Sequence, residues 1–424
     1  MRNLSRTGSF NWALLLTTLA VAGLGIVNLS SASRTATSNL AMVQGIWLGV
    51  GVGLAVVLTV LDYRIFERLA YPILIVTLVL LLAVLFAGRV ISGSQRWLHL
   101  GAFNFQPSEM AKIAVVLCVA KYFNDEPSLP ERGYNLRELI KPATILYPLG
   151  ALGALTLYWE RLPFLGGWRF ALLVGLLIWA AACFLYSLRR GRSSLHDLLS
   201  PVILVALPAV LILRQPDLGT TLVLFAVTGT MILFVKIKPL SLIIAGLAIM
   251  VAAASAWFFV LEPYQKKRVF AFIEPSADIK GSGYHAWQSR LAVGSGRVSG
   301  KGFGKSTQTQ FKFLPEQHTD FVFSVWAEEW GFTGCAGVLG LFLFWLLQMI
   351  NIASSARERF GALVAVGVIA LIFWHVAINI GMVIGVLPVV GITLPLWSYG
   401  GSSVLATMVA IGLLLSISLR RHNF

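Results

Sequence analysis

The sequence predicts an all-α membrane protein, a polytopic bundle of about twelve transmembrane helices with one large extracytoplasmic loop. Three observations lead to this fold class. Hydrophobic residues fill 57% of the 424 positions and charged residues only 12%, about half the charged share of a soluble domain. The mean hydropathy is +0.81. The apolar residues also gather in runs of the roughly 20 residues that one helix needs to cross a bilayer.

The apolar runs give the expected helices in chain order, each bounded by polar residues, glycine or proline. We expect helices at 11–31, 43–61, 70–88, 107–122, 142–159, 169–188, 197–213, 218–236, 239–261, 321–350, 360–386 and 396–418. The first run lacks a convincing small-residue cleavage site, so we expect it to be retained as a helix. The run 107–122 is short and starts with polar residues, so we expect neighbouring helices to shield it.

The charge balance indicates a membrane and no nucleic acid. The net charge is +15, from 33 Lys and Arg against 18 Asp and Glu. In a soluble protein this excess would indicate nucleic-acid binding. Here the basic residues lie in short connections between apolar runs, where they set topology and meet anionic headgroups. Cys118, Cys183 and Cys335 lie in or beside apolar runs and are interpreted as small hydrophobes.

The distribution of Lys and Arg over the connections predicts the orientation. With a cytoplasmic N-terminus, the cytoplasmic connections hold most of the basic residues, as in the clusters at 189–192 and 357–359. This positive-inside bias predicts that both termini are cytoplasmic. It places the segment 262–320 on the outer face of the membrane.

The segment 262–320 is the only long non-apolar stretch of the sequence. Its many glycines between Gly281 and Gly304 argue against a continuous helix and for close backbone approaches. It is rich in Lys and Arg, against the positive-inside bias. A long loop partly escapes that bias. The alternative is that this basic, aromatic-bearing loop binds an anionic ligand.

Four ionisable residues at or near membrane depth are candidates for a polar cavity, because such groups are costly there unless paired. Glu109 and Lys112 are three residues apart and can pair on one helical face. They serve a structural pairing or line a cavity. Asp217 follows a proline and begins a helix, where capping alone would explain it and a site role is the alternative. Arg214 could pair with Asp217 or face a phosphate.

Asp278, in the loop sequence EPSADIKGSGYH, is the candidate for chemistry. A transfer of a group to a hydroxyl needs a carboxylate near that hydroxyl to remove its proton. It also needs cations where the leaving group is an anion. The candidate cations are Arg268, Lys267, Lys280, Lys301 and Lys305. By sequence alone, a solvated turn aspartate is the alternative interpretation of Asp278.

Glu316, His318 and Asp320 form a second polar group just before an expected helix. Their spacing could ligate a metal, but the irregular backbone makes this a weak signal. An anchor for the end of the loop is favoured. The sequence therefore assigns no metal site.

The segment GVLPVVGITLPLWSYGGSS is also unusual, because two prolines and four glycines interrupt a hydrophobic region. Broken backbone at membrane depth is tolerated only where protein buries it or where it lines a cavity. We therefore expect a re-entrant loop beside the outer-face site, with Ser398 as a candidate contact. Gly400 and Gly401 bring backbone amides to a ligand, or else they permit tight helix packing.

Four separated motifs carry a family resemblance. They are RWLHLGAFNFQPSEMAK, QPDLGTTLVL, the run from DIKGSGYHAWQS through GKGFGKSTQTQFKFLPEQHTDFVFSVWAEEWG, and LPLWSYGGSS. With these motifs in this order, the chain resembles the SEDS proteins (shape, elongation, division and sporulation) from about residue 10 to 418. It is more similar to the RodA members than to the FtsW members, which commonly have Gln in place of His285.

The resemblance implies a peptidoglycan glycosyltransferase of the cytoplasmic membrane that uses lipid II during cell elongation and shape maintenance. It implies a class B penicillin-binding protein as the transpeptidase partner and the elongation machinery as the context. The essential acidic residue of the family lies in a D-x-x-G-x-G-Y segment and corresponds to Asp278. Its implied role is to deprotonate the acceptor 4-hydroxyl, which displaces undecaprenyl pyrophosphate with inversion.

The chain departs from the family in one respect. Family members usually have about ten helices, and this chain has two more expected helices, so we interpret 142–190 as an inserted helical hairpin within a single 1–424 domain. Its role is not assigned. The segment 262–320 is interpreted as the catalytic loop.

Two other functions compete with the polymerase. A flippase or transporter for the lipid-linked precursor would use the intramembrane residues Glu109, Lys112 and Asp217. A scaffold for the elongation machinery would need no site. The elaborate polar segment on the outer face favours the polymerase. No cofactor is assigned, and a requirement for a divalent cation such as Mg²⁺ or Mn²⁺ is left open.

Overall fold

The computed structural model describes residues 10–34, 39–91, 94–100, 103–125, 199–234, 284–311, 313 and 317–420. Helices dominate this part of the chain. They are α1 (Trp12–Ala32), α2 (Leu40–Val60), α3 (Tyr63–Ala87), α4 (Pro107–Asp125), α8 (Leu199–Arg214), α9 (Leu218–Leu233), α12 (Tyr284–Ser295), α13 (Thr307–Gln310), α14 (Val322–Ser355), α15 (Arg359–Ile384) and α16 (Gly401–Arg420). Six helices in these ranges are long and apolar enough to cross a membrane. The protein is therefore a helical, multi-pass membrane protein.

Short polar caps separate the apolar runs into helices. α1, α2 and α9 follow Asn11, Asn39 and Asp217, whose side-chain oxygens accept hydrogen bonds from backbone N–H groups of the first turn. α15 ends at Gly385, which adopts a φ of 81°. Glycine takes this left-handed conformation at little cost and so ends the helix.

The predicted helices that fall within the described ranges are present, and most of their ends differ by only a few residues. Two predicted starts are wrong by more. α3 begins at Tyr63, because Asp62 caps it and its first turns are charged, so that counting apolar residues omits them. α16 begins at Gly401, because the residues before it form turns. The predicted helices at 142–159, 169–188 and 239–261, and the hairpin 142–190, lie outside the described residues.

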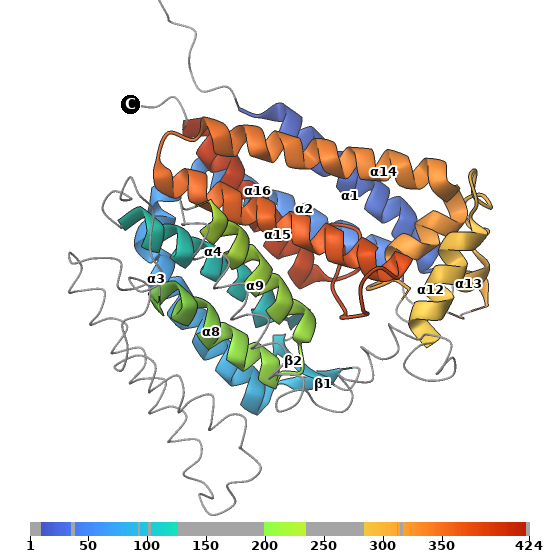
Figure 1. Ribbon diagram of the computed structural model, residues 1–424, viewed down its shortest axis with the longest axis horizontal. Coiled ribbons are helices and arrows are strands. Elements are labelled where there is room, and N and C mark those ends of the chain that lie inside the picture. The colour runs from blue at the N-terminus through green and yellow to red at the C-terminus, as the bar shows by residue number, and fades with distance from the viewer. Residues whose placement is uncertain are drawn as a thin grey trace, which may run out of the picture.

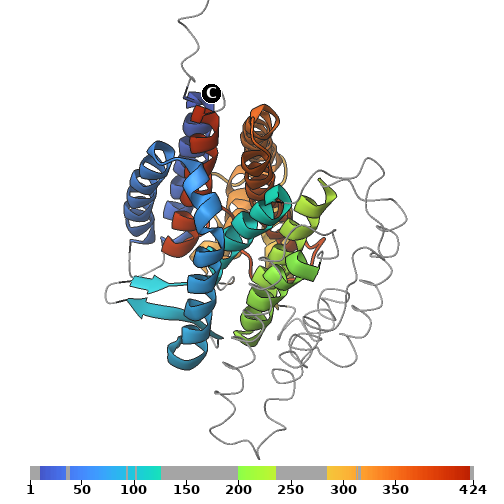
Figure 2. The same ribbon diagram turned by 90° about the vertical axis from the view of Figure 1, so that its left-hand side faces the viewer.

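The prediction of an all-α fold is wrong for the connection between α3 and α4. β1 (Arg89–Ile91), β2 (Ser94–Leu100) and β3 (Phe103–Phe105) form an antiparallel sheet in the order β1-β2-β3. Figure 2 shows it beside the helices near the end of α3. A search for apolar runs of helix length has no sensitivity to strands this short.

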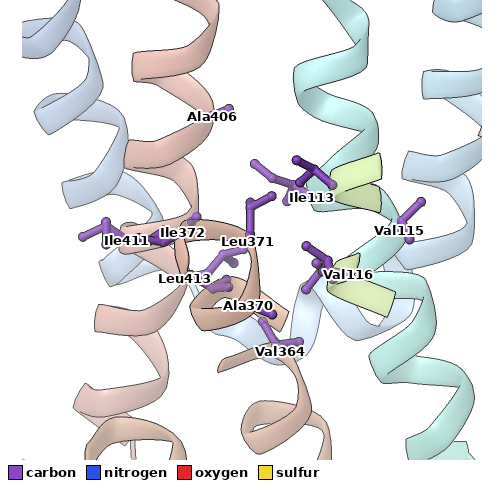
Figure 3. Packing of buried hydrophobic residues seen from close by; sticks show 14 of the residues in the cluster. Ile113, Val115, Val116, Val364, Ala370, Leu371, Ile372, Ala406, Ile411 and Leu413 are labelled. Carbon is purple, nitrogen blue, oxygen red and sulfur yellow. The ribbon is translucent and has the colours of Figure 1, made fainter. Parts of the chain in front are cut away.

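The helices pack around α15, which contacts α4, α9, α14 and α16. Figure 1 shows α14 along one edge of the bundle, with α3 and α8 at the opposite edge. Figure 3 shows buried side chains of α4, α15 and α16 converging, among them Val116, Leu371 and Leu413. This packing fixes the position of α4 against α15.

Small residues let α2 and α16 approach each other closely. A Cβ added at Gly412 would lie 2.9 Å from the Cα of Ala55, and one at Gly51 would lie 2.8 Å from the Cγ of Met408. In a bilayer, lipid is as apolar as the side chains, so such backbone proximity and its van der Waals contact stabilise helix pairs. The α2–α16 pair therefore forms one firm wall of the bundle.

α14 is interrupted at Gly331, where φ is 62° and ψ is −160°. The glycine-rich connection after α12 fills the interruption with its own backbone. Phe332 N donates to Arg297 O at 2.9 Å, and Gly302 N donates to Glu329 O at 2.9 Å. Backbone groups freed by the break are thus satisfied by protein, as an apolar surrounding requires.

Candidate functional site

A cavity of about 1120 Å³ lies within the bundle. Its wall combines α2, the β2–β3 hairpin, the starts of α4, α9 and α12, the residues before α14, the middle of α15 and the segment 389–403. Small-molecule pockets commonly measure about 300–1,000 Å³. This cavity is therefore large enough for a bulky ligand, and it brings together residues from most of the chain.

Glu109, Lys112 and His375 form a buried polar group on the cavity wall, which we call the α4–α15 cluster. The Lys112 ammonium lies 2.8 Å from Glu109 Oε1 and 2.8 Å from His375 Nε2. His375 Nδ1 lies 2.8 Å from the carbonyl oxygen of Leu371. All three residues of the cluster line the cavity. The two alternatives for Glu109 and Lys112, structural pairing and cavity lining, are thus combined in one arrangement.

Asp217 caps α9 at the cavity wall. Its Oδ1 accepts from the backbone N–H of Thr220 at 3.2 Å, and its Oδ2 accepts from the Thr220 hydroxyl at 2.9 Å. Its ion-pair partner is Arg96 of β2, with 3.6 Å between Nη1 and Oδ1. The sequence pointed instead to Arg214, which lies at the exposed end of α8 and does not line the cavity. Capping and cavity lining therefore coexist at Asp217.

Arg96 holds the turn between α8 and α9 from the β-hairpin. Its Nε donates to Gln215 O at 3.0 Å, and its Nη2 donates to Pro216 O. Because the β-sheet lies between α3 and α4 in the chain, β2 carries this guanidinium across to the start of α9. The sheet that the sequence did not predict is thus what positions a cation at the cavity.

His285, His318 and Asp320 line another part of the cavity. The His285 ring stacks on Phe321 with 6.2 Å between centroids. His318 is held by its backbone oxygen, which accepts from Tyr399 N at 2.8 Å. Asp320 O accepts from the Asn379 amide at 2.9 Å. These contacts bring the end of the connection before α14 to the site.

The segment before α16, which the sequence predicts as a re-entrant loop, forms turns and irregular backbone at the cavity wall. The Ser398 hydroxyl donates to Thr319 O at 2.5 Å and accepts from Leu394 N at 2.7 Å, so Ser398 shapes the turn and does not line the cavity. Gly400 N donates to Gln44 Oε1 at 3.2 Å. A Cβ at Gly401 would lie 2.6 Å from the Trp47 ring. Gly401 is thus closely packed, and both glycines also line the cavity, so the two alternatives for them coexist.

Two of the candidate substrate cations lie outside the cavity lining. Lys301 pairs with Glu328, with 2.6 Å between Nζ and Oε1, and Lys305 is exposed. Glu328 also accepts from the hydroxyls of Ser306 and Thr307, each at 2.6 Å. We call Glu328 and the groups it binds the loop anchor. The other predicted residues, Asp278, Arg268, Lys267, Lys280 and Glu316, lie outside the described residues.

The sequence interpretation missed four residues. Arg96 and His375 line the cavity, Glu328 belongs to the loop anchor, and the neighbouring Glu329 accepts at Oε1 from Gly304 N at 3.0 Å. A signal for three of them was present. A histidine in the middle of a 26-residue apolar helix and two adjacent glutamates in the run VFSVWAEEWG are ionisable groups inside apolar runs, which mark functional or paired positions. Arg96 gave no such signal, because only the unpredicted hairpin brings it to Asp217.

The cavity carries both signs of charge. Lys112 and Arg96 accompany Glu109, Asp217 and Asp320 on its wall. Within the described ranges, no group of three or more His, Cys, Asp or Glu side chains could hold a metal ion. With Lys112 and Arg96 on its wall, the described part of the cavity can bind anions, and its carboxylates can orient hydroxyl groups.

The whole chain matches proteins of one kind. The model of the family FTSW_RODA_SPOVE, described as cell cycle protein, matches residues 10–155 and 171–423. A peptidoglycan glycosyltransferase MrdB of Escherichia coli K12 is 35% identical over 380 residues, which are 88% of this chain and 84% of that protein. A peptidoglycan glycosyltransferase RodA of Treponema pallidum is 30% identical over 97% of this chain and 98% of the relative.

Solved structures agree with the sequence relatives. A chain from a study of polymerization and crosslinking by a peptidoglycan synthase complex has a TM-score of 0.71 and 29% identity, with 98% of this chain and 99% of that chain covered. The rod shape determining protein RodA of Thermus thermophilus has a TM-score of 0.60 and 28% identity over the same shares.

Proposed function

The chain belongs to the FtsW, RodA and SpoVE family of cell cycle proteins, and from that premise we propose that it polymerises lipid II into glycan strands for cell elongation and shape. It is a peptidoglycan glycosyltransferase, as its full-length relatives are named. The observation that carries the proposal is the large cavity, which gathers paired charges inside an apolar bundle. Ionisable groups are costly inside a membrane, so their presence around a cavity indicates a function.

The proposed reaction is an inverting glycosyl transfer. Asp278 acts as the general base and takes the proton of the acceptor 4-hydroxyl as that oxygen bonds to the anomeric carbon of the donor. The bond from this carbon to the pyrophosphate oxygen breaks, and undecaprenyl pyrophosphate leaves with the bonding electron pair. The configuration changes from α to β. Donor and acceptor are both lipid II or its polymer.

Cations are proposed to stabilise the charge that develops on the pyrophosphate. Lys112 and Arg96 are the cations on the described cavity wall. Arg268, Lys267, Lys280 and Lys305 are proposed to add to them from the loop. Lys301 is retained as a candidate only if its pair with Glu328 opens. A divalent cation such as Mg²⁺ or Mn²⁺ is an open part of this proposal, and polymerisation with and without a chelator decides whether one is needed.

The assembly around the enzyme follows from the family. We propose a cytoplasmic-membrane protein of about twelve helices, a ten-helix core plus the hairpin 142–190, with both termini cytoplasmic and the site on the outer face. A class B penicillin-binding protein is the proposed partner within the elongation machinery. The likeness to a synthase complex that polymerises and crosslinks supports such a partner.

The test of the function is an Asp278→Ala variant assayed with purified partner and lipid II. We expect glycan chains to disappear while partner binding and the unfolding midpoint stay near wild type. An Asp278→Asn variant keeps the side-chain volume and should fail equally, because it cannot accept the proton. Polymer at the wild-type rate in either variant would contradict the assignment.

A flippase is the second candidate, favoured by Glu109, Lys112 and Asp217 within the bundle. Proteoliposomes with labelled lipid II in the inner leaflet separate the two functions. A flippase moves the label outward without a partner and without polymer. The proposed polymerase makes glycan only from lipid II in the leaflet that its site faces.

A further inference from the structure

His375 stands out among the buried polar groups because its two ring nitrogens have different partners. Nδ1 lies 2.8 Å from Leu371 O, one turn earlier on α15, and a carbonyl only accepts, so Nδ1 carries the proton. Nε2 is therefore the unprotonated nitrogen. It lies 2.8 Å from the Lys112 ammonium on α4, and an ammonium only donates.

Lys112 is thus fixed from two sides. One N–H of its ammonium is directed to Glu109 Oε1 and another to His375 Nε2, each at 2.8 Å. An ammonium has three N–H donors, and the described residues provide these two acceptors. The Lys112 side chain is 3% exposed and lines the cavity. The third N–H is left for a group inside the cavity.

The two acceptors have different electrostatic effects. Glu109 is one turn away on the same helix and offsets the charge of Lys112. His375 comes from another helix, bears no charge in this tautomer, and supplies only direction. Buried close packing between α4 and α15, through Val116 and Gly367, holds the two partners at this separation. The imidazole can therefore orient the ammonium without cancelling its charge.

We propose that His375 is a positioning residue, which aims the Lys112 ammonium at the pyrophosphate of the lipid-linked substrate. This rests on the proposed function of the cavity and adds a residue and a role to it. A charged donor that is already held in place stabilises a developing negative charge more than a donor that must first reorient. His375 acts through Lys112 and does not itself touch the substrate.

Three substitutions separate this role from packing. His375→Gln places an amide oxygen the same number of bonds from Cβ as Nε2, so it can accept from Lys112. His375→Asn places its amide at the level of Nδ1, so it can only replace the bond to Leu371. His375→Phe keeps a ring and removes both. Phe373→Leu, on the exposed side of the same helix, is the control.

The readout is kcat/KM for lipid II polymerisation with the partner present. We expect His375→Phe and His375→Asn to lose about 10- to 100-fold, the cost of a small misplacement, and His375→Gln to stay within about threefold of wild type. Phe373→Leu should match wild type. Equal rates for the Gln and Asn variants would overturn the proposal, as would an active Phe variant. If the Phe variant does not fold, the Gln and Asn pair decides.

A second measurement tests whether His375 acts through Lys112. The Kd for undecaprenyl pyrophosphate is compared for His375→Phe in the wild-type background and in a Glu109→Gln, Lys112→Met background. We expect His375→Phe to weaken binding of this lipid roughly tenfold in the wild-type background and to have no effect in the background that lacks Glu109 and Lys112. The same weakening in both would show a packing role and overturn the proposal. Wild-type protein that binds this lipid but makes no glycan would contradict the proposed function alone.

Discussion

Two lysine–glutamate pairs in this protein have similar geometry and different surroundings. Both glutamates and Lys112 are buried, whereas Lys301 is partly exposed. In the α4–α15 cluster, Lys112 and Glu109 are 2.8 Å apart and line the cavity. In the loop anchor, Lys301 and Glu328 are 2.6 Å apart and lie outside its lining. The Glu328 carboxylate accepts hydrogen bonds from hydroxyl and backbone N–H groups of Ser306 and Thr307. The α4–α15 cluster faces the cavity instead.

The comparison shows that a buried charge pair does not by itself identify a site. The Glu328 carboxylate is surrounded by protein donors and holds a segment in place, whereas the Lys112–Glu109 pair lies beside a cavity in which a ligand can reach it. Both satisfy the rule that buried charges must be paired.

The largest expected effect is on stability, at the loop anchor. Lys301→Met leaves the fully buried Glu328 carboxylate without its cation, and breaking a buried pair in this way costs about 3 kcal/mol or more. We expect the free energy of unfolding in detergent to fall by that amount, while kcat per folded enzyme changes little. The double variant Lys301→Met, Glu328→Gln should recover much of the loss. Activity lost without a change in stability would show that Lys301 binds substrate.

The second effect is on activity, at the α4–α15 cluster, with little change in stability. Glu109→Gln with Lys112→Met removes both charges together, so no unpaired charge remains and the stability cost is small. We expect kcat for polymerisation to fall about 10²-fold, the usual loss on removing one preorganised donor, or about 2.7 kcal/mol. A double variant that polymerises normally would make this pair a structural one, equivalent to the loop anchor.

The third effect concerns the connection after α12, where its backbone packs against the break in α14. Gly300 has a φ of 75°, and a Cβ there would lie 2.1 Å from Glu329 O. We therefore expect Gly300→Ala to lower the free energy of unfolding by about 2 kcal/mol. Gly337 of α14 has open space around its Cα, so Gly337→Ala should leave stability unchanged or slightly raised. Equal responses of the two variants would count against a tight fit of the connection in the α14 break.

The smallest effect belongs to an exposed pair. Glu358, between α14 and α15, accepts from Arg64 Nε at 3.2 Å and from the Tyr63 hydroxyl at 2.8 Å. The Arg64 hydrogen bond holds the pKa of the Glu358 carboxyl below its usual value. Both side chains are more than a third exposed, so the pair is worth under about 1 kcal/mol.

A lowered folded-state pKa fixes the sign of the pH dependence. The contribution of Glu358 is present above the unfolded pKa of about 4.3 and is lost as the pH falls through the folded value. We expect Glu358→Gln to be slightly less stable than wild type at pH 7 and equal to it well below pH 4. Unfolding midpoints measured across this range check the prediction, and a difference that persists in acid would contradict it.

Much of the helical architecture could be predicted because each transmembrane helix must bury about 20 apolar residues and satisfy its own backbone. That is why α1 was expected at 11–31 and lies at Trp12–Ala32. The β-hairpin could not be predicted this way, since its strands have three to seven residues. The Glu109–Lys112 pair was within reach of sequence reasoning, because helical geometry brings residues three apart together.

The membrane class, the helical runs, the charged pair within α4 and the family resemblance are all legible in the sequence, because they depend on local spacing or on ordered motifs. Tertiary structure alone decided that His375 meets Lys112 across 263 positions, that Arg96 pairs with Asp217, and that Lys301 serves Glu328. The physical reason is that a long side chain can reach any partner the packing of helices brings within hydrogen-bonding distance, and spacing along the chain does not encode that packing.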